Sequence, residues 1–245
     1  MKYAVITGST KGIGKAIAEK LLSNGYYALL NYAHDEKSAR ETQEQFGERF
    51  PGCFSIGKAD LSSIDGLNDY FEFIRKHTDT LDCIVLNVAM TDRSNFDDIT
   101  PESWQRIMDT NLTVPFFLVQ GCNGKKGVKL REQSSILFIG ALMGKVPHAI
   151  SLAYGISKAA VNFMAQCLVK EFASKKITVN AVAPGFVDTP WQLDKPDAIR
   201  KNIENKTALG RFGRVEEVAD LCYHVIQNSY INGSVLDIHG GYDYK

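Results

Sequence analysis

The chain lacks an excess of charge of either sign, and it lacks a long apolar run. Its 245 residues carry 28 Lys and Arg against 28 Asp and Glu, so no overall field favours nucleic acid or an anionic membrane. No apolar run approaches the ~20 residues that span a bilayer, and the apolar run at the N-terminus is too short for a signal peptide. We therefore predict a cytoplasmic protein with no nucleic-acid partner and no membrane partner.

Disulfide and metal-binding patterns are missing as well. The five cysteines are widely spaced and include no Cys-x-x-Cys, which is typical of buried, reduced thiols. The five histidines are scattered, with no His-Glu-x-x-His. We expect no metal site. With 44% hydrophobic and 23% charged residues, the composition is that of an ordinary globular protein able to bury a sizeable core.

Short apolar runs alternate with longer segments of helical period. The runs lack polar alternation, so both faces of each strand should be buried in a parallel sheet between helices. We predict one doubly wound α/β domain of the Rossmann type over residues 1–245, with about seven parallel strands and helices on both faces. The expected strands are residues 3–7, 27–32, 53–59, 82–88, 136–140, 177–183 and 234–238. The expected helices are residues 13–24, 35–50, 64–77, 101–108, 113–122, 153–173 and 215–227.

Two stretches interrupt this alternation. Residues 121–127 are glycine-rich and basic, which fits a solvated loop or an anion site, and the helix before them should end early. Residues 188–211 lie between a strand and a helix and contain two prolines. Long loops after strand C-termini in open α/β sheets tend to cover ligand crevices, so we predict a substrate lid here. Trp191, Leu193 and Phe212 would make its pocket partly apolar, unless they only pack the lid.

A glycine-rich turn, Thr7 to Gly14, follows the first expected strand and opens a helix. In this context glycines let the backbone approach a pyrophosphate, and the helix N-terminus supplies N–H donors. The turn predicts a dinucleotide site. The residues predicted to contact the cofactor here are Gly8, Ser9, Thr10, Lys11, Gly12, Ile13 and Gly14.

The end of the second expected strand bears on which dinucleotide binds. An NAD site would place an acid there for the ribose 2′-hydroxyl, but no acid precedes Asp35. Lys11 lies in the glycine turn, where its ammonium can meet a 2′-phosphate; the alternative is a solvated loop lysine. The missing acid and the nearby cation together favour NADP(H).

Tyr154 and Lys158 lie four residues apart and share one face of an expected helix. The cation should favour the phenolate and lower the pKa of Tyr154 from ~10, which would make it a catalytic proton donor or acceptor. On its own the pair is equally typical of an amphipathic surface helix.

Taken in order, these motifs make the chain resemble the short-chain dehydrogenase/reductase family over essentially its full length. The family pattern Thr-Gly-x-x-x-Gly-x-Gly matches Thr7 to Gly14, and Tyr-x-x-x-Lys matches Tyr154 and Lys158. The resemblance implies that Asn111 is the active-site asparagine, a homotetramer or homodimer, and donation of the pro-S hydride. It also implies cofactor contacts at Asp60, Leu61, Asn87, Ala89, Pro184, Gly185, Val187 and Thr189.

Within the family, the chain is most similar to the β-ketoacyl-carrier-protein reductase branch of fatty acid biosynthesis, through residues 180–185 and 233–241 and the Lys11 turn. Enoyl reductases of the wider group usually place six residues between tyrosine and lysine, whereas three intervene here. The implied function is NADPH-dependent reduction of a ketone such as a 3-oxoacyl thioester. Tyr154 would protonate the carbonyl oxygen, Lys158 would hold the nicotinamide ribose, and Asn111 would hold a water for proton relay.

The chain departs from the family at two positions. Ala141 stands where the family has a catalytic serine, and losing one such donor typically costs about 10²–10³ in rate. Three explanations are open: a nearby serine substitutes, Tyr154 alone polarises the carbonyl in a slow enzyme, or the chain is a catalytically silent NADP-binding sensor or partner protein. The candidate serines are Ser151, Ser134 and Ser135. Met90 replaces a family glycine, which predicts a small backbone adjustment or a narrowed cofactor cleft.

Overall fold

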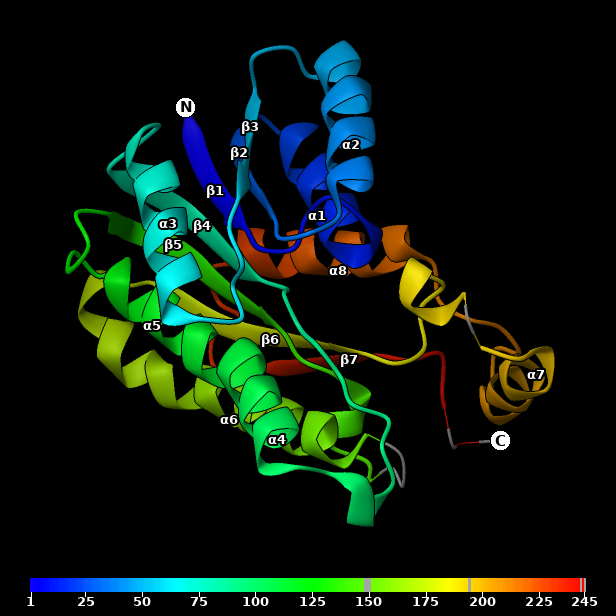
Figure 1. The fold of residues 1–245 in the computed structure, drawn as a ribbon. Helices are drawn as coiled ribbons and strands as arrows, with labels where there is room; N and C mark the ends of the chain where they lie inside the picture. Colours follow the sequence, from blue (N-terminus) through cyan, green and yellow to red (C-terminus); the bar gives the residue numbers. More distant parts are fainter. Residues whose placement is uncertain (148–150, 194, 243, 245) are drawn as a thin grey trace.

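The computed structural model describes residues 1–147, 151–193, 195–242 and 244 (Figure 1). A seven-stranded sheet runs in the order β3-β2-β1-β4-β5-β6-β7, and every neighbouring pair is parallel. The strands are β1 (Lys2–Ile6), β2 (Tyr26–Tyr32), β3 (Phe54–Lys58), β4 (Thr80–Leu86), β5 (Lys129–Ile139), β6 (Thr178–Pro184) and β7 (Val235–Ile238). The predicted doubly wound fold is confirmed.

The strand order reverses between β1 and β4. The chain first builds outward from β1 to β3 and then crosses to β4 on the other side of β1. In open α/β sheets, such a reversal leaves a crevice outside the carboxyl ends of the strands, where ligands bind. The glycine turn after β1 lies at this point.

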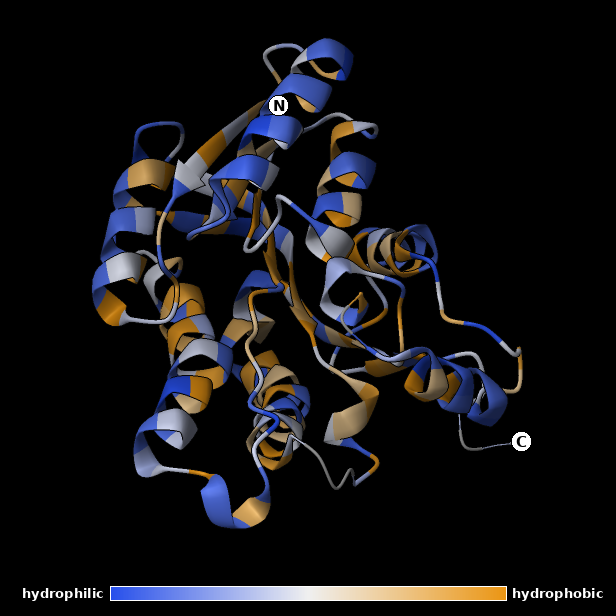
Figure 2. Cartoon of the chain, turned by 45° about the vertical axis from the view of Figure 1, so that its right-hand side comes forward, coloured by the Kyte–Doolittle hydropathy of each residue, from blue (hydrophilic) through white to orange (hydrophobic). Residues whose placement is uncertain are grey.

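Helices cover both faces of the sheet (Figure 1). The α-helices are α1 (Gly12–Leu22), α2 (Glu36–Arg49), α3 (Ile64–Arg75), α4 (Pro101–Met108), α5 (Val114–Gly121), α6 (Leu152–Phe172), α7 (Asp197–Lys206) and α8 (Val215–Gln227). One core forms between the sheet and α3, α5 and α6, and a second forms between the opposite face and α1, α2 and α8. Apolar residues accordingly gather on the strands and the inner helix faces, with polar residues outside (Figure 2).

Three segments differ from the sequence-based expectation. The expected strand 136–140 covers only the end of β5, which begins at Lys129 and bends where Gln133 adopts a φ of +62°. Within the expected lid loop, the structure has the helix α7 and the short 3₁₀ turn η5 (Pro190–Gln192). A π-helical turn, η2 (Asp109–Thr113), precedes α5. The helix α5 does end early, at Gly121, and residues 121–127 form a loop closed by an Asn123–Lys129 bridge.

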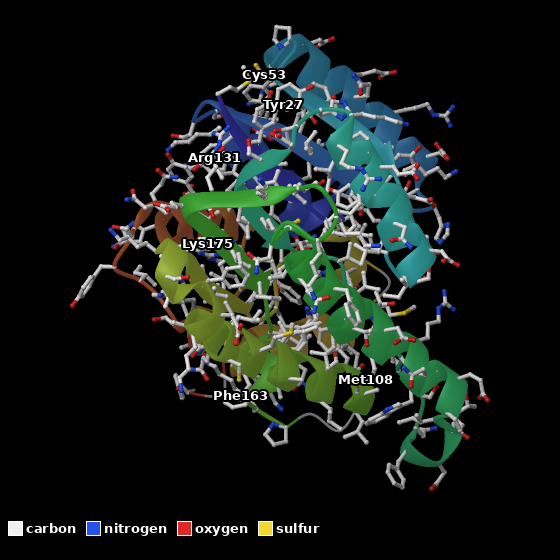
Figure 3. All side chains as sticks on the ribbon, turned by 90° about the vertical axis from the view of Figure 1, so that its left-hand side faces the viewer. Tyr27, Cys53, Met108, Arg131, Phe163 and Lys175 are labelled. Carbon is white, nitrogen blue, oxygen red and sulfur yellow. The ribbon has the colours of Figure 1, made fainter. Side chains whose placement is uncertain are left out.

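The five cysteines are all free, but they are not all buried as expected. Cys83, Cys122 and Cys222 are buried, Cys53 is half-buried and Cys167 is exposed (Cys53 is labelled in Figure 3). Across the described ranges, no three His, Cys, Asp or Glu side chains gather into a possible metal site. In the same ranges, no helix is both long and apolar enough to span a bilayer.

Candidate active site

The glycine turn is built so that its backbone lies bare at the switch point. Gly8 and Gly12 adopt φ angles of +59° and +56°, in the left-handed region that favours glycine. A Cβ on Gly14 would lie 2.2 Å from the Gly8 carbonyl oxygen and 2.5 Å from the Asn87 amide nitrogen. No side chain fits at Gly14, so α1 starts directly against the turn. Such close packing of the helix start on the turn is the role of the last glycine in a dinucleotide-binding turn.

Asn31, which the sequence analysis did not single out, holds this turn to the second strand. It is 1% exposed; its Oδ1 accepts from the Gly8 N–H at 3.2 Å and its Nδ2 donates to the Ala59 carbonyl at 3.0 Å. The Ser9 hydroxyl donates to the Ile6 carbonyl at 2.8 Å and accepts from the Asn31 N–H at 3.0 Å. The signal in the sequence was a lone polar residue at the end of a buried apolar run.

The hydroxyl of Ser9 is thus used by the fold, and Thr10 is also buried, with its carbonyl bonded to Thr42. Any contact these two make with a nucleotide would come from their main chain. Ile13 packs against the α1–sheet core and is half-buried.

Asn87 and Thr7 join the glycine turn to the end of β4. The Asn87 amide donates to the Gly8 carbonyl at 2.9 Å and to the Thr7 carbonyl at 3.1 Å. In return, the Thr7 hydroxyl accepts from the N–H groups of Asn87 and Val88 at 2.9 and 3.1 Å. Asn87 therefore fixes the glycine turn from the β4 side of the switch point. Ala89, two residues later, is half-buried at the same edge of the sheet.

Lys11 is neither isolated nor simply solvated. Its Nζ lies 2.7 Å from the Asp35 carboxylate, with the two side chains 53% and 36% exposed. Asp35 also caps α2 by accepting from the Ser38 N–H at 3.0 Å. Hydrogen bonds from Lys11 and then Ser38 lower the pKa of Asp35 to about 2. Asp35, the first acid after the second strand, thus lies in contact with Lys11 of the glycine turn.

Asp60 and Leu61 follow β3 at the same edge of the sheet. Burial opposes ionisation of Asp60, but hydrogen bonds from Ser62 and the nearby His34 and Arg106 outweigh it, so its pKa is lowered. Leu61 is 3% exposed, and its side chain belongs to the core, which leaves only its main chain for a ligand.

Asn111 lies in the π-helical turn η2 and is 1% exposed. Its Oδ1 accepts from the Met90 N–H at 2.8 Å, and its Nδ2 donates to the Met90 carbonyl at 2.9 Å and to the Ser157 hydroxyl at 2.9 Å. Ser157 in turn donates to the Tyr154 carbonyl at 2.7 Å. Asn111 therefore ties the loop after β4 to the helix that carries Tyr154. Single π turns of this kind are frequent at functional sites.

Met90 is accommodated by its surroundings. Its main chain makes two hydrogen bonds to Asn111, and its sulfur accepts from the Thr110 hydroxyl at 3.3 Å. The side chain thus turns toward η2.

Tyr154 and Lys158 share one face of α6, as their spacing predicts. The Lys158 Nζ lies 5.8 Å from the centre of the Tyr154 ring and donates to the Ile139 carbonyl at 2.6 Å. Burial lowers the pKa of Lys158 to about 8 and raises the pKa of Tyr154 to about 12. The expected fall in the tyrosine pKa is therefore wrong for the chain's own residues, because desolvation outweighs the distant and carbonyl-bound ammonium.

Ala141 follows β5 and is 5% exposed. The register pairs Ser135 with Cys83 and with Thr178, the first residue of β6, so Ser134 and Ser135 lie toward the opposite end of the strands. The interpretation that either of these serines replaces the missing hydroxyl is wrong. Ser151 opens α6 with a φ of +71°, three residues before Tyr154, and remains a candidate donor.

The residues after β6 reach back to the glycine turn. A Cβ on Gly12 would meet the Thr189 methyl group at 3.5 Å. Gly185 approaches the backbone before the C-terminus so closely that a Cβ would lie 2.6 Å from the Cβ of His239. Pro184 ends β6 in the core, and Val187 is 4% exposed and bridges Gly213. Thr189 is the residue of this group that faces the turn.

Arg200 of α7 joins several residues of the segment after β6 to one another. Arg200 of α7 pairs with Asp188 at 3.0 Å, donates to the Gln192 carbonyl at 3.3 Å and lies 4.4 Å from the centre of the Phe212 ring. The ring of Trp191 lies 6.1 Å from that of Tyr154. The sequence predicted a lid in this segment, but it did not reveal the contact of Trp191 with the tyrosine.

Comparison with known proteins agrees with this geometry. The family model described as enoyl-(acyl carrier protein) reductase matches residues 8–243. The 3-oxoacyl-[acyl-carrier-protein] reductase FabG of Aquifex aeolicus is 32% identical over 245 residues, covering 98% of this chain and 96% of its own. Glucose 1-dehydrogenase 2 of Bacillus subtilis is 31% identical over 244 residues, covering 98% and 94%. A solved structure, the angucycline C-6 ketoreductase LanV with bound NADP, has a TM-score of 0.90 at 28% identity, covering 100% and 96%.

A parallel doubly wound sheet with a bare glycine turn at its switch point defines the Rossmann class of proteins. The chain belongs to the short-chain dehydrogenase/reductase family, close to its FabG branch, and this family consists of oxidoreductases. The predicted family is confirmed.

Proposed function

We propose that the protein is an NADP(H)-dependent oxidoreductase that reduces a ketone to an alcohol, with Tyr154 as the acid. The observation that carries this proposal is the placement of Tyr154 and Lys158 on α6, tied through Ser157 to Asn111, at the strand edge that holds the glycine turn. Bound NADPH supplies a hydride to the carbonyl carbon. Tyr154 gives its proton to the carbonyl oxygen and is reprotonated from solvent, so that ketone, hydride and proton yield the alcohol.

The glycine turn and the residues around it fit a dinucleotide. Because no side chain fits at Gly14, α1 begins directly against the turn, and a helix N-terminus offers N–H donors to a phosphate. The proposed contacts are Gly8, Ser9, Thr10, Lys11, Gly12, Ile13, Gly14, Asp60, Leu61, Asn87, Ala89, Pro184, Gly185, Val187 and Thr189, with Tyr154 and Lys158 at the nicotinamide end. We propose that the Lys11 ammonium binds the 2′-phosphate of NADP(H). The NADP bound in the LanV structure supports this choice of cofactor.

The state of Tyr154 suits reduction. With a pKa of about 12, the phenol keeps its proton at neutral pH and can donate it. Lys158 is charged below about pH 8, and its proposed role is to hold a ribose hydroxyl. The two amide donors of Asn111 are already used, so a water held for proton relay would bond the second lone pair of its Oδ1 or its main chain.

For the substrate, we propose a ketone such as a 3-oxoacyl thioester, in a role like that of FabG in fatty acid biosynthesis. The similarity to FabG supports this class, although a glucose dehydrogenase is almost equally similar. The spacing of Tyr154 and Lys158 favours ketone over enoyl reduction, in spite of the description that the family model carries. Residues 188–211 would form the substrate lid of a single domain.

One observation favours a second function. Ala141 leaves the site without the usual hydroxyl, and Ser134 and Ser135 lie too far along β5 to replace it. On this alternative, the protein binds NADP(H) as a catalytically weak sensor or partner subunit.

The deciding experiment follows NADPH oxidation against a panel of ketones, including acetoacetyl thioesters, for the wild type and two variants. Reduction is supported if the wild type turns over and Tyr154→Phe does not. Absence of turnover on every ketone, together with a large gain in Ala141→Ser, supports the sensor. Equal rates in the wild type and Tyr154→Phe overturn the proposed role of Tyr154.

A further inference from the structure

Trp191 lies directly beside the proposed acid. The ring centres of Trp191 and Tyr154 are 6.1 Å apart and their planes are inclined at 54°. The indole is 42% exposed, so part of its surface packs on the protein and part stays open. Aromatic groups attract one another at ring-centre distances of about 4.5–7 Å, so the open part can take a further ring.

The position of Trp191 is held by several contacts. The Gln192 N–H donates to the Thr189 carbonyl at 2.8 Å, which closes the turn that carries the indole. Arg200 then fixes this turn by donating to the Gln192 carbonyl and by pairing with Asp188. The backbone that carries the indole is therefore held close to Tyr154.

Position 141, after β5, supplies no hydroxyl to orient a carbonyl. Ala141 presents a methyl group, and the next residue, Leu142, is buried in a cluster with Phe212 and Ile203. A single hydrogen bond from Tyr154 leaves a bound ketone free to rotate about that bond. Rates depend strongly on the orientation of the reacting groups, so a second contact must fix the carbonyl.

We propose that Trp191 is the residue that orients the substrate, by stacking on a planar apolar group next to the carbonyl. The substrate is then an aryl or similarly conjugated ketone, and a 3-oxoacyl thioester qualifies only if its acyl group carries such a plane. This inference rests on the proposed ketone reduction and narrows its substrate class. Packing of the substrate against the indole replaces the hydrogen bond that a serine at position 141 would make.

The test compares two ketones of equal carbon count, acetophenone and cyclohexyl methyl ketone, of which only the first has a planar ring. The ratio of their kcat/KM values is measured in the wild type, Trp191→Phe and Trp191→Ala, so the intrinsic reactivity of each ketone cancels between proteins. Ile199→Ala, on the exposed side of α7, is the control within the same segment.

We expect the ratio of acetophenone to cyclohexyl methyl ketone to fall about fivefold to tenfold in Trp191→Ala, as the strength of aromatic pairs implies. Trp191→Phe should keep most of the preference, and Ile199→Ala should keep all of it. An unchanged ratio in Trp191→Ala, with both ketones still reduced, overturns the inference and leaves ketone reduction standing.

Binding supplies a readout that does not need turnover. The dissociation constant of each ketone for the NADPH-loaded protein is measured by ligand-observed NMR. If acetophenone alone binds more weakly to Trp191→Ala, the inference is supported even if neither ketone is reduced. The absence of reduction would instead count against the proposed function. Equal loss, or no loss, for both ketones overturns the inference.

Discussion

At the scale of single residues, burial decides the protonation of the two central groups. Lys158 is 3% exposed, and its ammonium bonds a main-chain carbonyl, so its charge stabilises the Tyr154 phenolate too little to offset desolvation. The phenol therefore stays protonated and the lysine becomes the group that titrates near working pH. A helical spacing in the sequence shows that two side chains share a face, but it does not show how deeply they are buried.

The lowered pKa of Lys158 predicts that the activity depends on pH. As the pH rises through about 8, Lys158 loses its proton, and with it the charge that would hold the ribose of an anionic cofactor. We expect kcat/KM for NADPH to be level at lower pH and to fall above about pH 8, because this ratio reports the free enzyme. Lys158→Met should give a low and flat profile. A wild-type profile that stays level to pH 9.5 would contradict the proposed role of Lys158.

The ion pair between Lys11 and Asp35 predicts an effect on cofactor choice. Asp35 neutralises the cation proposed to meet the 2′-phosphate, and a phosphate must compete with it. Asp35→Asn keeps a good helix cap and should tighten NADPH binding several-fold while leaving NADH unchanged. Lys11→Met should weaken NADPH binding about tenfold, as expected for a lost charged hydrogen bond. Calorimetric titration of both cofactors checks this; equal changes for NADPH and NADH would refute it.

At the scale of elements, the buried strands were predictable, and the polar segments were not. Runs such as residues 83–86 are apolar throughout because helices cover both faces of the sheet. The first half of β5 is largely exposed and polar, so it carries no such run. α7 was missed because it buries only Ile203 along its length.

In the candidate site, too, some features were predictable from the sequence and others were not. The motif residues meet because parallel strands end at one edge, which the sequence implies. The π turn at Asn111, the contact of Trp191 with Tyr154 and the bond from Asn31 to the glycine turn each depend on segments distant in sequence. Ser134 and Ser135 precede the expected strand 136–140, so that expectation already placed them at the end of the strand away from Ala141.

The start of α1 gives a prediction at this scale. In Gly14→Ala the new methyl group would meet the Gly8 carbonyl at 2.2 Å. We expect destabilisation of about 1–3 kcal/mol, as for other overpacked sites, together with loss of NADPH binding. Gly47→Ala is the matched control, since nothing lies within 4 Å of its Cβ in the interior of α2. It should stabilise the protein by about 0.5–1 kcal/mol and leave binding intact. Urea unfolding and cofactor titration distinguish the two; normal binding by Gly14→Ala would contradict the proposed role of the glycine turn.

At the scale of the whole molecule, an apolar face remains uncovered on α5 and α6. Phe116 and Phe117 of α5 are 37% and 41% exposed, and Ile156 and Phe163 of α6 are 44% and 65% exposed. Phe163 lies at the surface in Figure 3. Large exposed apolar side chains can mark interaction surfaces, so we take the outer sides of α5 and α6 as one candidate face. We propose that this face joins copies of the chain into a homodimer or homotetramer.

Phe163→Glu should break that assembly, because it places a charge in the centre of the proposed contact. We expect the mass measured by light scattering to fall to that of a smaller species. Tyr230→Glu is the control, as Tyr230 is 97% exposed after α8 and should leave the mass unchanged. A monomeric wild type, or an assembly that survives Phe163→Glu, would rule out this interface.

The central claim is that the chain transfers a hydride to a ketone, with Tyr154 providing the proton. The most direct measurement uses NADPH deuterated at the pro-S hydrogen of its nicotinamide ring, with acetophenone and acetoacetyl thioester as acceptors and mass spectrometry of the products. We predict alcohol that carries one deuterium on the former carbonyl carbon, formed by the wild type and not by Tyr154→Phe. No alcohol from either acceptor would contradict the account, and alcohol without deuterium would contradict transfer of the pro-S hydride.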